Sequence, residues 1–481
     1  MHNSPKISLT QLLNTPKKNF NGDFAYSKDL QKILAGKQLL FDDHIASNEE
    51  ILRHYDHGYI CFRKGIIATG SGLQCLRCGN TDPHFFASFL CERCQKNCIY
   101  CRRCIMMGRV SSCSPLISWC GPAPKIQSKN ETLYWEGTLS SGQQKASEAV
   151  ARAIAQNREL LVWAVTGAGK TEVLFNGIGQ ALQAGKRICI ATPRTDVVLE
   201  LTPRLKKVFP NHQVASLYGG SNDRHTFAEI TISTTHQLLR FYHAFDAVIV
   251  DEVDAFPYTV EPMLQYAVKQ ARKPVSAMIY LTATPNERWQ RECEAGKRAY
   301  VTIPARYHRH PLPVPKFVWC GNWEKNLGKG SLPAIVREWI NDHLQIEKQI
   351  LLFIPQIKYI PKILPILRKL HPAIEAVHAA DQERKEKVQR MRDKEILVLV
   401  TTTILERGVT FPNIDVAVLG AEDKIFSESA LVQISGRAGR SYQYPTGEIV
   451  FFHFGKTTAM VNAYRQIRNM NQLAEKMGLI D

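Results

Sequence analysis

A short loop in the sequence has the residue types needed to bind phosphate. In "ELLVWAVTGAGKTEVL", glycines, a lysine and a threonine follow an expected strand and precede an expected helix. Backbone N–H groups of such a loop can turn toward a phosphate, and a helix N-terminus favours negative charge. Lys170 would reach the β- and γ-phosphates of ATP, and Thr171 would offer its hydroxyl to Mg²⁺. Ala164 departs from the usual pattern, which has glycine there. The residues of the candidate loop are Thr166, Gly167, Ala168, Gly169, Lys170 and Thr171.

A second stretch, "FDAVIVDEVDAFPY", supplies carboxylates at the end of an apolar run. Asp251, Glu252 and Asp254 would repel one another unless a cation lies among them. A phosphate loop needs such a partner strand, so we expect Asp251 to hold Mg²⁺. Glu252 would position and deprotonate the attacking water. Asp254 is expected to connect this motif to later ones.

A third motif, "VQISGRAGR", contains two arginines close to the C-terminal end of the chain. Arg437 and Arg440 are three residues apart, so a helix would present both on one face. Planar guanidinium groups suit the charge that spreads over a γ-phosphoryl group during transfer. These arginines fall in a second set of strands, which predicts that ATP sits in a cleft between two domains.

Cysteines with metal-ligand spacing cluster upstream of these motifs. "CLRCG" and "YCRRC" each contain a C-x-x-C pair, and four such thiolates suit tetrahedral Zn²⁺. The favoured ligands are Cys75, Cys78, Cys101 and Cys104. Two alternatives stay open: Cys75 and Cys78 pair with Cys91 and Cys94, or a second zinc uses Cys91, Cys94, Cys98 and Cys113. The isolated cysteines, expected to be small buried side chains, are Cys61, Cys120, Cys189, Cys293 and Cys320.

Zinc in this region would stabilise a small fold rather than perform catalysis, because four thiolates leave no open position for a substrate. Basic and aromatic residues are interleaved with the cysteines. They could bind single-stranded nucleic acid, or the rings could be buried and the arginines solvated. These residues are Arg77, Arg93, Arg102, Arg103, Arg109, Phe85, Phe86 and Tyr100.

The composition indicates either a polyanionic partner or a basic surface whose charges are scattered. The chain has 481 residues with 61 Lys plus Arg against 44 Asp plus Glu, a formal net charge of +17. Nucleic acid is the first expectation and an anionic membrane face the second. No stretch resembles a signal peptide, and no apolar run reaches the ~18 residues of a spanning helix. Clustered cysteines without an export signal indicate metal ligation in a reducing cytoplasm rather than a disulfide framework.

Two sets of apolar runs, expected to be strands, alternate with amphipathic segments from about residue 160. The first set is "ELLVWAV", "RICIATP", "EITIST", "DAVIVDE" and "MIYLTATP", and the second is "QILLFIP", "IEAVHA", "EILVLVTTT", "IDVAVLGAE" and "GEIVFFHF". The stretch "IPARYHRHPLPVP" separates the sets and is suited to a linker. Such alternation predicts an α/β fold with parallel sheets buried on both faces, in two tandem domains. We expect an N-terminal region of unknown role at 1–60, a zinc-binding module at 61–130, an ATP-binding α/β domain at 131–305 and a second α/β domain at 306–481.

Taken in order, the motifs resemble those of superfamily 2 helicases and translocases over residues 131–455. They run from "LSSGQQKAS" through "AVTGAGKTE", "DEVD", "LTATP" and "LVTTTILERGVTF" to "QISGRAGR". Within that superfamily, "DEVDAFPY", "ERGVTF" and the cysteine signature look like the ComFA family of late-competence DNA-uptake ATPases. Primosomal restart helicases are similar, because they share both a cysteine cluster and the motor motifs.

The resemblance implies RecA-like motor domains and roles for further residues. Gln143 would contact the adenine, with Gln144 as the neighbouring alternative, and Gly408 would line the nucleotide site. Thr410 stands where many members carry Asp, which puts ribose recognition there in doubt. The residues that would couple ATP to DNA are Thr282 and Thr284. Those that would line the single-strand path are Pro193, Arg194, Thr234 and Thr235.

The sequence therefore predicts a DNA-dependent ATPase that uses ATP, Mg²⁺ and Zn²⁺ and moves along single-stranded DNA during competence. The resemblance places it in the cytoplasm at the inner face of the membrane, with other competence proteins and the membrane DNA channel as partners. Peripheral membrane contact is expected, without a transmembrane segment. A replication-restart helicase and a zinc-dependent DNA-binding scaffold with a non-cycling motor are the alternatives.

Overall fold

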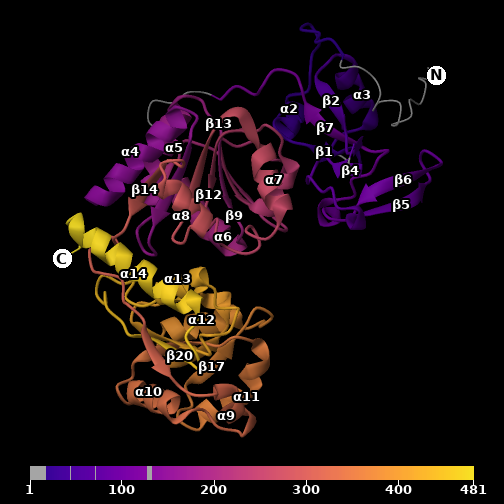
Figure 1. Ribbon diagram of the computed structural model, residues 1–481. Helices are drawn as coiled ribbons and strands as arrows, with labels where there is room; N and C mark the ends of the chain where they lie inside the picture. The colour runs from indigo at the N-terminus through magenta and orange to yellow at the C-terminus, as the bar shows by residue number, and fades with distance from the viewer. Residues whose placement is uncertain (1–17, 44, 71, 127–132, 481) are drawn as a thin grey trace. The chain divides into compact units, whose positions relative to one another are not determined.

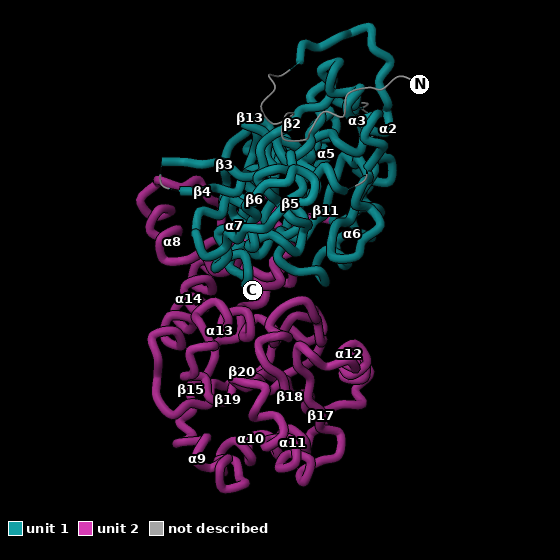
Figure 2. The backbone as a smooth tube through the Cα atoms, turned by 90° about the vertical axis from the view of Figure 1, so that its right-hand side faces the viewer, with its two compact units in different colours: residues 1–137, 147–161, 174–281 teal, residues 138–146, 162–173, 282–481 magenta. Residues whose placement is uncertain are grey.

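The computed structural model describes residues 18–480 apart from 44, 71 and 127–132 (Figure 1). The chain divides into two compact units, coloured teal and magenta in Figure 2. The first contains the described residues of 1–137 together with 147–161 and 174–281. The second contains 138–146, 162–173 and the described residues of 282–481. The expected boundary at 130/131 lies outside the described residues.

The first large sheet has seven strands in the order β10-β11-β9-β12-β13-β8-β14. The pairs β10–β11, β11–β9, β9–β12 and β12–β13 are parallel. Each run predicted as a strand in this part is one, whereas β10 and β14 were not predicted. The bounds are β8 Glu159–Ala164, β9 Ile188–Thr192, β10 Val214–Leu217, β11 Ile230–Thr234, β12 Phe245–Val250, β13 Arg272–Thr282 and β14 Tyr300–Ile303.

Amphipathic helices connect these strands. In α6 the buried residues include Val197, Val198, Leu201 and Leu205, a spacing of three to four that gives the helix one apolar face. That face packs on β9, β10 and β11. The helices of this part are α4 Ser141–Ala155, α5 Glu172–Gln183, α6 Thr195–Val208, α7 Pro262–Ala271 and α8 Glu287–Glu294.

The second large sheet has six strands in the order β15-β20-β19-β16-β18-β17, and all its neighbouring pairs are parallel. Its predicted strands are confirmed, and β15 is an addition. The strands are β15 Lys316–Trp319, β16 Gln349–Phe353, β17 Ile374–Val377, β18 Val398–Thr401, β19 Ile414–Leu419 and β20 Ile449–His453. The helices are α9 Trp323–Gly328, α10 Ala334–Gln345, α11 Ile360–Arg368, α12 Arg384–Arg392, α13 Glu428–Ser435 and α14 Thr458–Lys476. The predicted fold class, two parallel-sheet RecA-like domains after a small cysteine-rich module, is confirmed.

The N-terminal module combines a three-stranded sheet, order β1-β7-β2, with the hairpins β3–β4 and β5–β6. Leu39 of β1 lies opposite Ile117 of β7, so residues before 61 share a sheet with the cysteine region. A small apolar core lies under this sheet and includes Leu34, Ile51 and Ile60. The elements are α2 Lys28–Leu34, α3 Asn48–Asp56, β1 Leu39–Leu40, β2 Ile60–Lys64, β3 Ile66–Thr69, β4 Gly72–Cys75, β5 Phe86–Cys91, β6 Lys96–Cys101 and β7 Pro115–Trp119.

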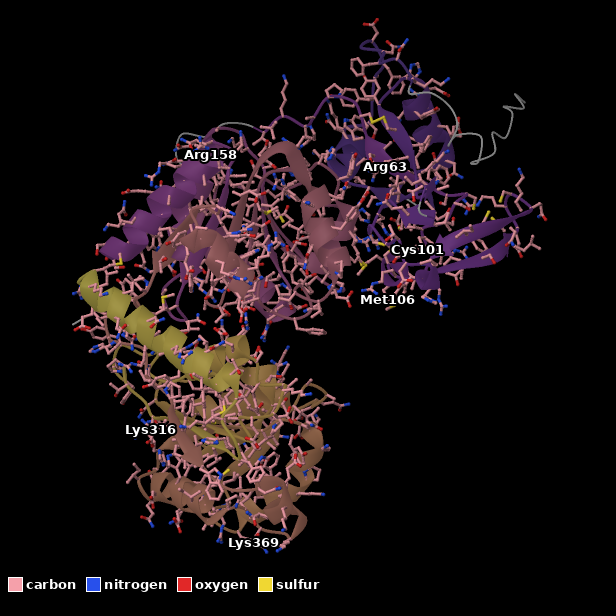
Figure 3. All side chains as sticks on the ribbon, in the orientation of Figure 1. Arg63, Cys101, Met106, Arg158, Lys316 and Lys369 are labelled. Atoms are coloured by element: carbon pink, nitrogen blue, oxygen red, sulfur yellow. A yellow bond between two sulfur atoms is a disulfide. The ribbon has the colours of Figure 1, made fainter. Side chains whose placement is uncertain are left out.

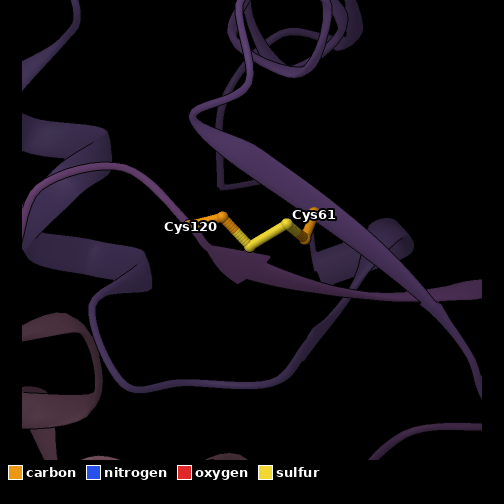
Figure 4. Close-up of a disulfide and its surroundings, with 2 residues drawn as sticks. All are labelled: Cys61 and Cys120. Atoms are coloured by element: carbon orange, nitrogen blue, oxygen red, sulfur yellow. A yellow bond between two sulfur atoms is a disulfide. The ribbon is translucent and has the colours of Figure 1, made fainter. Parts of the chain in front are cut away.

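A disulfide joins Cys61 to Cys120 across a sequence separation of 59 (Figure 4). The antiparallel pairing of β2 with β7 sets Cys61 opposite Ser118, which brings the two cysteines together. The expectation that both are isolated is therefore wrong. The other cysteines expected to be isolated, Cys189, Cys293 and Cys320, are free and buried.

The N-terminal module contacts the first large sheet's domain through buried polar groups of the first unit. The Lys37 ammonium donates to the Arg224 carbonyl oxygen at 2.9 Å and is only 1% exposed. The Gln38 side-chain amide donates to the Leu239 carbonyl oxygen at 3.1 Å. These bonds satisfy groups that would otherwise be costly to bury.

We predict that Lys37→Met changes the pH dependence of stability. Burial, followed by the charges of Arg187, Arg240 and Arg224, lowers the pKa of Lys37 from 10.5 to about 7. Between pH 7 and pH 10.5 the unfolded chain binds more protons at this lysine than the folded chain does, so wild-type stability should rise with pH. Below pH 7 the folded chain bears the full cost of the buried charge. The temperatures of thermal unfolding of the wild type and of Lys37→Met are compared near pH 7 and at about pH 9.5. The wild-type temperature should rise relative to that of Lys37→Met at the higher pH.

Lys64 provides the control for this measurement, since its side chain is exposed. Lys64→Met should leave the pH profile parallel to that of the wild type. Parallel profiles for wild type and Lys37→Met would contradict the prediction.

Candidate active site and metal centre

The candidate phosphate loop lies between β8 and α5, as the sequence predicts. Gly167 and Gly169 have φ values of +80° and +69°, a left-handed conformation that glycine adopts without a Cβ penalty. The Ala168 N–H donates to the Val165 carbonyl oxygen at 3.2 Å, which closes the turn. Helix α5 begins at Glu172, directly after Lys170 and Thr171. The loop therefore has the backbone form that suits a nucleotide phosphate at a helix N-terminus.

Gln143 lies against this loop within the second unit. Its side-chain amide donates to the Ala168 carbonyl oxygen at 2.9 Å, and its carbonyl oxygen accepts from the Ser140 N–H at 2.8 Å. The side chain is 2% exposed, whereas Gln144 is exposed. Of the two neighbouring glutamines, Gln143 is the one fixed beside the loop.

The acidic motif follows β12 in the first unit. The Asp251 N–H donates to the Ala191 carbonyl oxygen at 2.8 Å, so the strand pairing with β9 continues to this residue. The Glu252 N–H donates to the Asp251 carboxylate at 2.9 Å. Glu252 has φ +53°, in the left-handed region that non-glycine residues rarely adopt. The left-handed conformation is thus adopted here by an acidic residue and not by a glycine.

The two arginines of the third motif do not lie on a helix, contrary to expectation. Helix α13 ends at Ser435, Arg437 lies in the turn that follows, and Arg440 comes directly after that turn. Arg437 is 2% exposed and donates to the carbonyl oxygens of Glu406, at 2.9 Å, and Val409. The Arg440 guanidinium donates to the Gly436 carbonyl oxygen at 2.7 Å. Helical spacing failed here because Gly436 and Gly439, φ +64°, follow the helix.

Arg306 is a residue that the sequence reasoning missed. It falls in the stretch expected to be a linker, yet it is 2% exposed. Within the second unit its guanidinium donates to the Ala438 carbonyl oxygen at 2.9 Å and to that of Gly439. The next N–H, of Tyr307, donates to the Gly167 carbonyl oxygen at 3.3 Å. Burial, followed by the charge of Arg440, lowers the pKa of Arg306 to about 9. Two arginines, Arg306 and Arg309, inside an otherwise Pro- and His-rich stretch were the available signal.

The residues expected to couple ATP to DNA, and those expected to line the DNA path, lie at or just after strand ends. Thr282 and Thr284 are buried, and the Thr284 hydroxyl is 2.8 Å from that of Ser429 within the second unit. Arg194 precedes α6 and forms an ion pair with Asp196 at 2.6 Å. The remaining positions are Pro193, half-buried after β9, Thr234 and Thr235, buried at the end of β11, and Gly408 and Thr410, exposed before Phe411.

The cysteines gather into two groups of four thiols in the N-terminal module. Cys75, Cys78, Cys101 and Cys104 form the first, and Cys91, Cys94, Cys98 and Cys113 form the second. Within each group the sulfur atoms lie within 4.8 Å of one another. Figure 3 labels Cys101 of the first group. The alternative that pairs Cys75 and Cys78 with Cys91 and Cys94 is therefore wrong.

Sulfur separations in both groups fit a tetrahedral metal. Cys75 and Cys104 are 4.0 Å apart at sulfur, and Cys78 and Cys101 are 3.7 Å apart. In the second group the Cys91–Cys113 separation is 3.7 Å. Zn–S bonds of about 2.3 Å in tetrahedral geometry require roughly 3.8 Å between sulfurs. Each group could thus hold one zinc ion.

Some of these thiols are in surroundings that favour the thiolate, the form that binds metal. Hydrogen bonds from Cys101, Cys75 and Cys78, together with the Arg77 cation, hold the pKa of Cys104 well below its ordinary value. The Arg77 guanidinium lies 3.1 Å from the Cys104 sulfur.

The arginines of the module lie in different surroundings. Arg77 is 3% exposed and structural. Arg93 forms an ion pair with Asp42 at 2.9 Å. Arg109 lies over the Phe89 ring, 4.1 Å from its centroid, with its side chain exposed. Arg109 is therefore available to contact a phosphate backbone, whereas exposed Arg102 fits the interpretation in which the arginines are solvated.

Family models cover most of the chain. The competence protein ComFA N-terminal domain matches residues 18–118, the type III restriction enzyme res subunit matches 136–287, and the helicase conserved C-terminal domain matches 332–442. Competence protein ComFA of Bacillus subtilis (strain 168) is 48% identical, covering 95% of this chain and 98% of that protein. The chain belongs to the ComFA family. Competence protein ComFA of Streptococcus pneumoniae (strain ATCC BAA-255 / R6) is 38% identical, covering 80% and 90% of the two chains.

A solved structure confirms the motor fold. The DEAD-box helicase Mss116 bound to ssRNA and UDP-BeF matches 66% of this chain and 70% of its own, with a TM-score of 0.52 and 17% identity. This ComFA family member is therefore a superfamily 2 helicase-type ATPase of competence. Its helicase domains imply nucleotide and Mg²⁺ use and nucleic-acid binding. Among the helices of the described ranges, none has the length and apolarity needed to cross a bilayer.

We predict that this chain binds two zinc ions, one in each cysteine group. Cys75→Ser with Cys78→Ser should remove one ion, and Cys91→Ser with Cys94→Ser should remove the other. Metal content of the purified chains, measured by mass spectrometry, checks this. Cys293→Ser, at a buried cysteine outside both groups, serves as the control and should retain both ions. A single ion in the wild type would contradict the prediction.

Proposed function

We propose that this chain is an ATP-driven motor that moves along single-stranded DNA and draws incoming DNA into the cytoplasm during natural competence. The observation that carries the proposal is the near full-length similarity to ComFA together with retention of both nucleotide motifs. Lys170 and Thr171 follow the loop between β8 and α5, and Asp251 and Glu252 follow β12. A motor that no longer cycles would have no need to retain these residues together.

Each residue has a defined chemical task in this proposal. Lys170 binds the β- and γ-phosphates, while the Thr171 hydroxyl and the Asp251 carboxylate hold Mg²⁺. The ion supplies positive charge that offsets the charge developing on the phosphoryl oxygens. Glu252 orients the attacking water and accepts its proton. Arg437 and Arg440 stabilise the negative charge of the transferring group.

Gln143 fits a role in nucleotide recognition, because its side chain already contacts the phosphate loop. The path of the DNA would follow Pro193, Arg194, Thr234 and Thr235, at the ends of β9 and β11. A net charge of +17 supports a polyanionic partner. We place the protein at the inner face of the membrane, where other competence proteins and the DNA channel would be its partners.

The first test is Lys170→Ala. Loss of the phosphate-binding cation should lower ATP hydrolysis stimulated by single-stranded DNA by about 10²-fold or more, while DNA binding remains close to wild type. Steady-state ATPase rates and fluorescence anisotropy with a labelled oligonucleotide check both parts. Lys145→Ala, at an exposed lysine of α4, is the control and should be unchanged. Turnover that survived Lys170→Ala would show that the site assignment is wrong.

The same preparations separate this function from its alternatives. Parallel ATPase rates with DNA and RNA test the polymer, and a strand-displacement assay tests for a duplex-unwinding restart helicase. Transformation frequency in competent cells carrying Lys170→Ala tests the link to DNA uptake. No stimulated turnover in the wild type would favour a DNA-binding scaffold instead.

A further inference from the structure

The first cysteine group lies directly on helix α7 within the first unit. The Tyr266 hydroxyl, on α7, donates to the Leu76 carbonyl oxygen at 3.2 Å. The Arg103 guanidinium forms an ion pair with the Glu261 carboxylate, at the residue that precedes α7. Leu76 lies inside the first C-x-x-C pair and Arg103 inside the second, so both pairs contact the same helix.

The contact with Tyr266 is close enough to require glycine. Gly79, directly after the first C-x-x-C pair, has φ +73°, and a Cβ there would lie 2.5 Å from Tyr266 Cδ2. The Gly79 N–H donates to the Cys75 carbonyl oxygen at 2.8 Å, so the turn that meets the ring also carries a metal ligand. Tyr266 therefore packs on the metal-binding turn itself.

Arg103 is held by an aromatic ring as well as by Glu261. Its guanidinium carbon lies 4.5 Å from the centroid of the Phe85 ring, a cation–π distance. The Arg103 and Glu261 side chains are 25% and 33% exposed, so the ion pair is partly shielded from water. This arrangement fixes the direction in which the second C-x-x-C pair approaches α7.

Arg77 joins the two C-x-x-C pairs to each other. Its guanidinium donates to the carbonyl oxygens of Cys104 at 2.7 Å, Gly108 at 2.6 Å and Met107 at 2.8 Å. With four thiols bound to one ion, the two pairs would move as one body. A displacement of either C-x-x-C pair would therefore alter both the Tyr266 contact and the Arg103–Glu261 contact.

Helix α7 is in turn connected to the carboxylates by consecutive turns. The Ala255 N–H donates to the Glu252 carbonyl oxygen at 2.9 Å, and the Thr259 N–H donates to that of Ala255 at 3.3 Å. The Glu261 N–H donates to the Pro257 carbonyl oxygen at 3.0 Å, just before α7 begins. Glu252 itself is in the left-handed region, φ +53°, a conformation that persists only where its surroundings enforce it.

We propose that Arg103 and Tyr266 are positioning residues that seat the cysteine group on α7 and, through residues 253–261, hold Glu252 in place. The metal-binding module thereby sets the geometry of the acidic motif as well as its own fold. Since Glu252 is assigned a catalytic task only in the proposed function, the catalytic consequence rests on that proposal, whereas the mechanical link does not. Neither positioning residue is assigned a contact with the nucleotide, so the link should affect kcat more than the KM for ATP.

The test compares neighbouring arginines of one turn. Arg103→Gln removes the ion pair with Glu261. Arg102→Gln removes the same positive charge from an exposed neighbouring side chain. Hydrogen–deuterium exchange of residues 253–261 should be faster in Arg103→Gln by roughly two- to five-fold, the range for a partly exposed ion pair, with zinc content unchanged. The kcat for ATP should fall by a similar factor of about two to five. Arg102→Gln should match the wild type in all of these measurements.

Two further variants sharpen the result. Glu261→Gln should reproduce Arg103→Gln, and the double variant should be no worse than either alone, because both remove the same interaction. Tyr266→Phe keeps the ring on Gly79 but removes the donor to Leu76, and it should also accelerate exchange in residues 253–261.

The outcomes are distinguishable from a failure of the proposed function. A wild-type chain without ATPase activity would reject that function, but the exchange comparison would still decide the link to α7. Equal exchange in Arg103→Gln and Arg102→Gln would overturn the inference. Loss of zinc from Arg103→Gln would also overturn it, since Arg103 would then serve to retain the metal.

Discussion

Burial of the parallel strands on both faces is the constraint on which the rest of the molecule depends. A strand covered on both sides has no room for unsatisfied polar groups, so charged side chains are confined to strand ends. β12 is buried from Ala247 to Val250 and is followed at once by Asp251. β8 is followed in the same way by the phosphate loop. Chemistry is therefore concentrated where the chain must also turn, and the turn has to be stabilised.

The two turns are stabilised by different means. At the phosphate loop, Gly167 and Gly169 take the left-handed conformation, so the local sequence is sufficient. At the acidic motif, Glu252 takes that conformation without glycine, which transfers the requirement to the residues around it. In the proposed arrangement the small N-terminal module supplies the contacts that hold Glu252. This module has a small apolar core, and its cysteine groups and the Cys61–Cys120 disulfide stabilise its fold.

The features that could be predicted from the sequence are those that depend on residues close together in the chain. Strands such as β12 are encoded locally by apolar runs, and paired C-x-x-C spacing favoured the first cysteine group. The Cys61–Cys120 bond depends on the pairing of β2 with β7, which has no local signal. The contacts of Arg103 and Tyr266 also join segments far apart in the chain, so motif spacing could not reveal them. The helix expected at Arg437 ended at Ser435 because Gly436 directly follows it.

Arg306 and Arg437 show how buried cations organise a loop that has no secondary structure. Carbonyl groups in such a loop still need donors, and a guanidinium offers five in a fixed plane. Arg306 donates to the carbonyl oxygens of Ala438 and Gly439, while Arg437 donates to those of Glu406 and Val409. The arginine motif is thus held by its own cation and by one from outside it. Burial, followed by the charge of Arg440, lowers the pKa of Arg306, and the positive field of such neighbouring cations favours an anion such as a phosphoryl group.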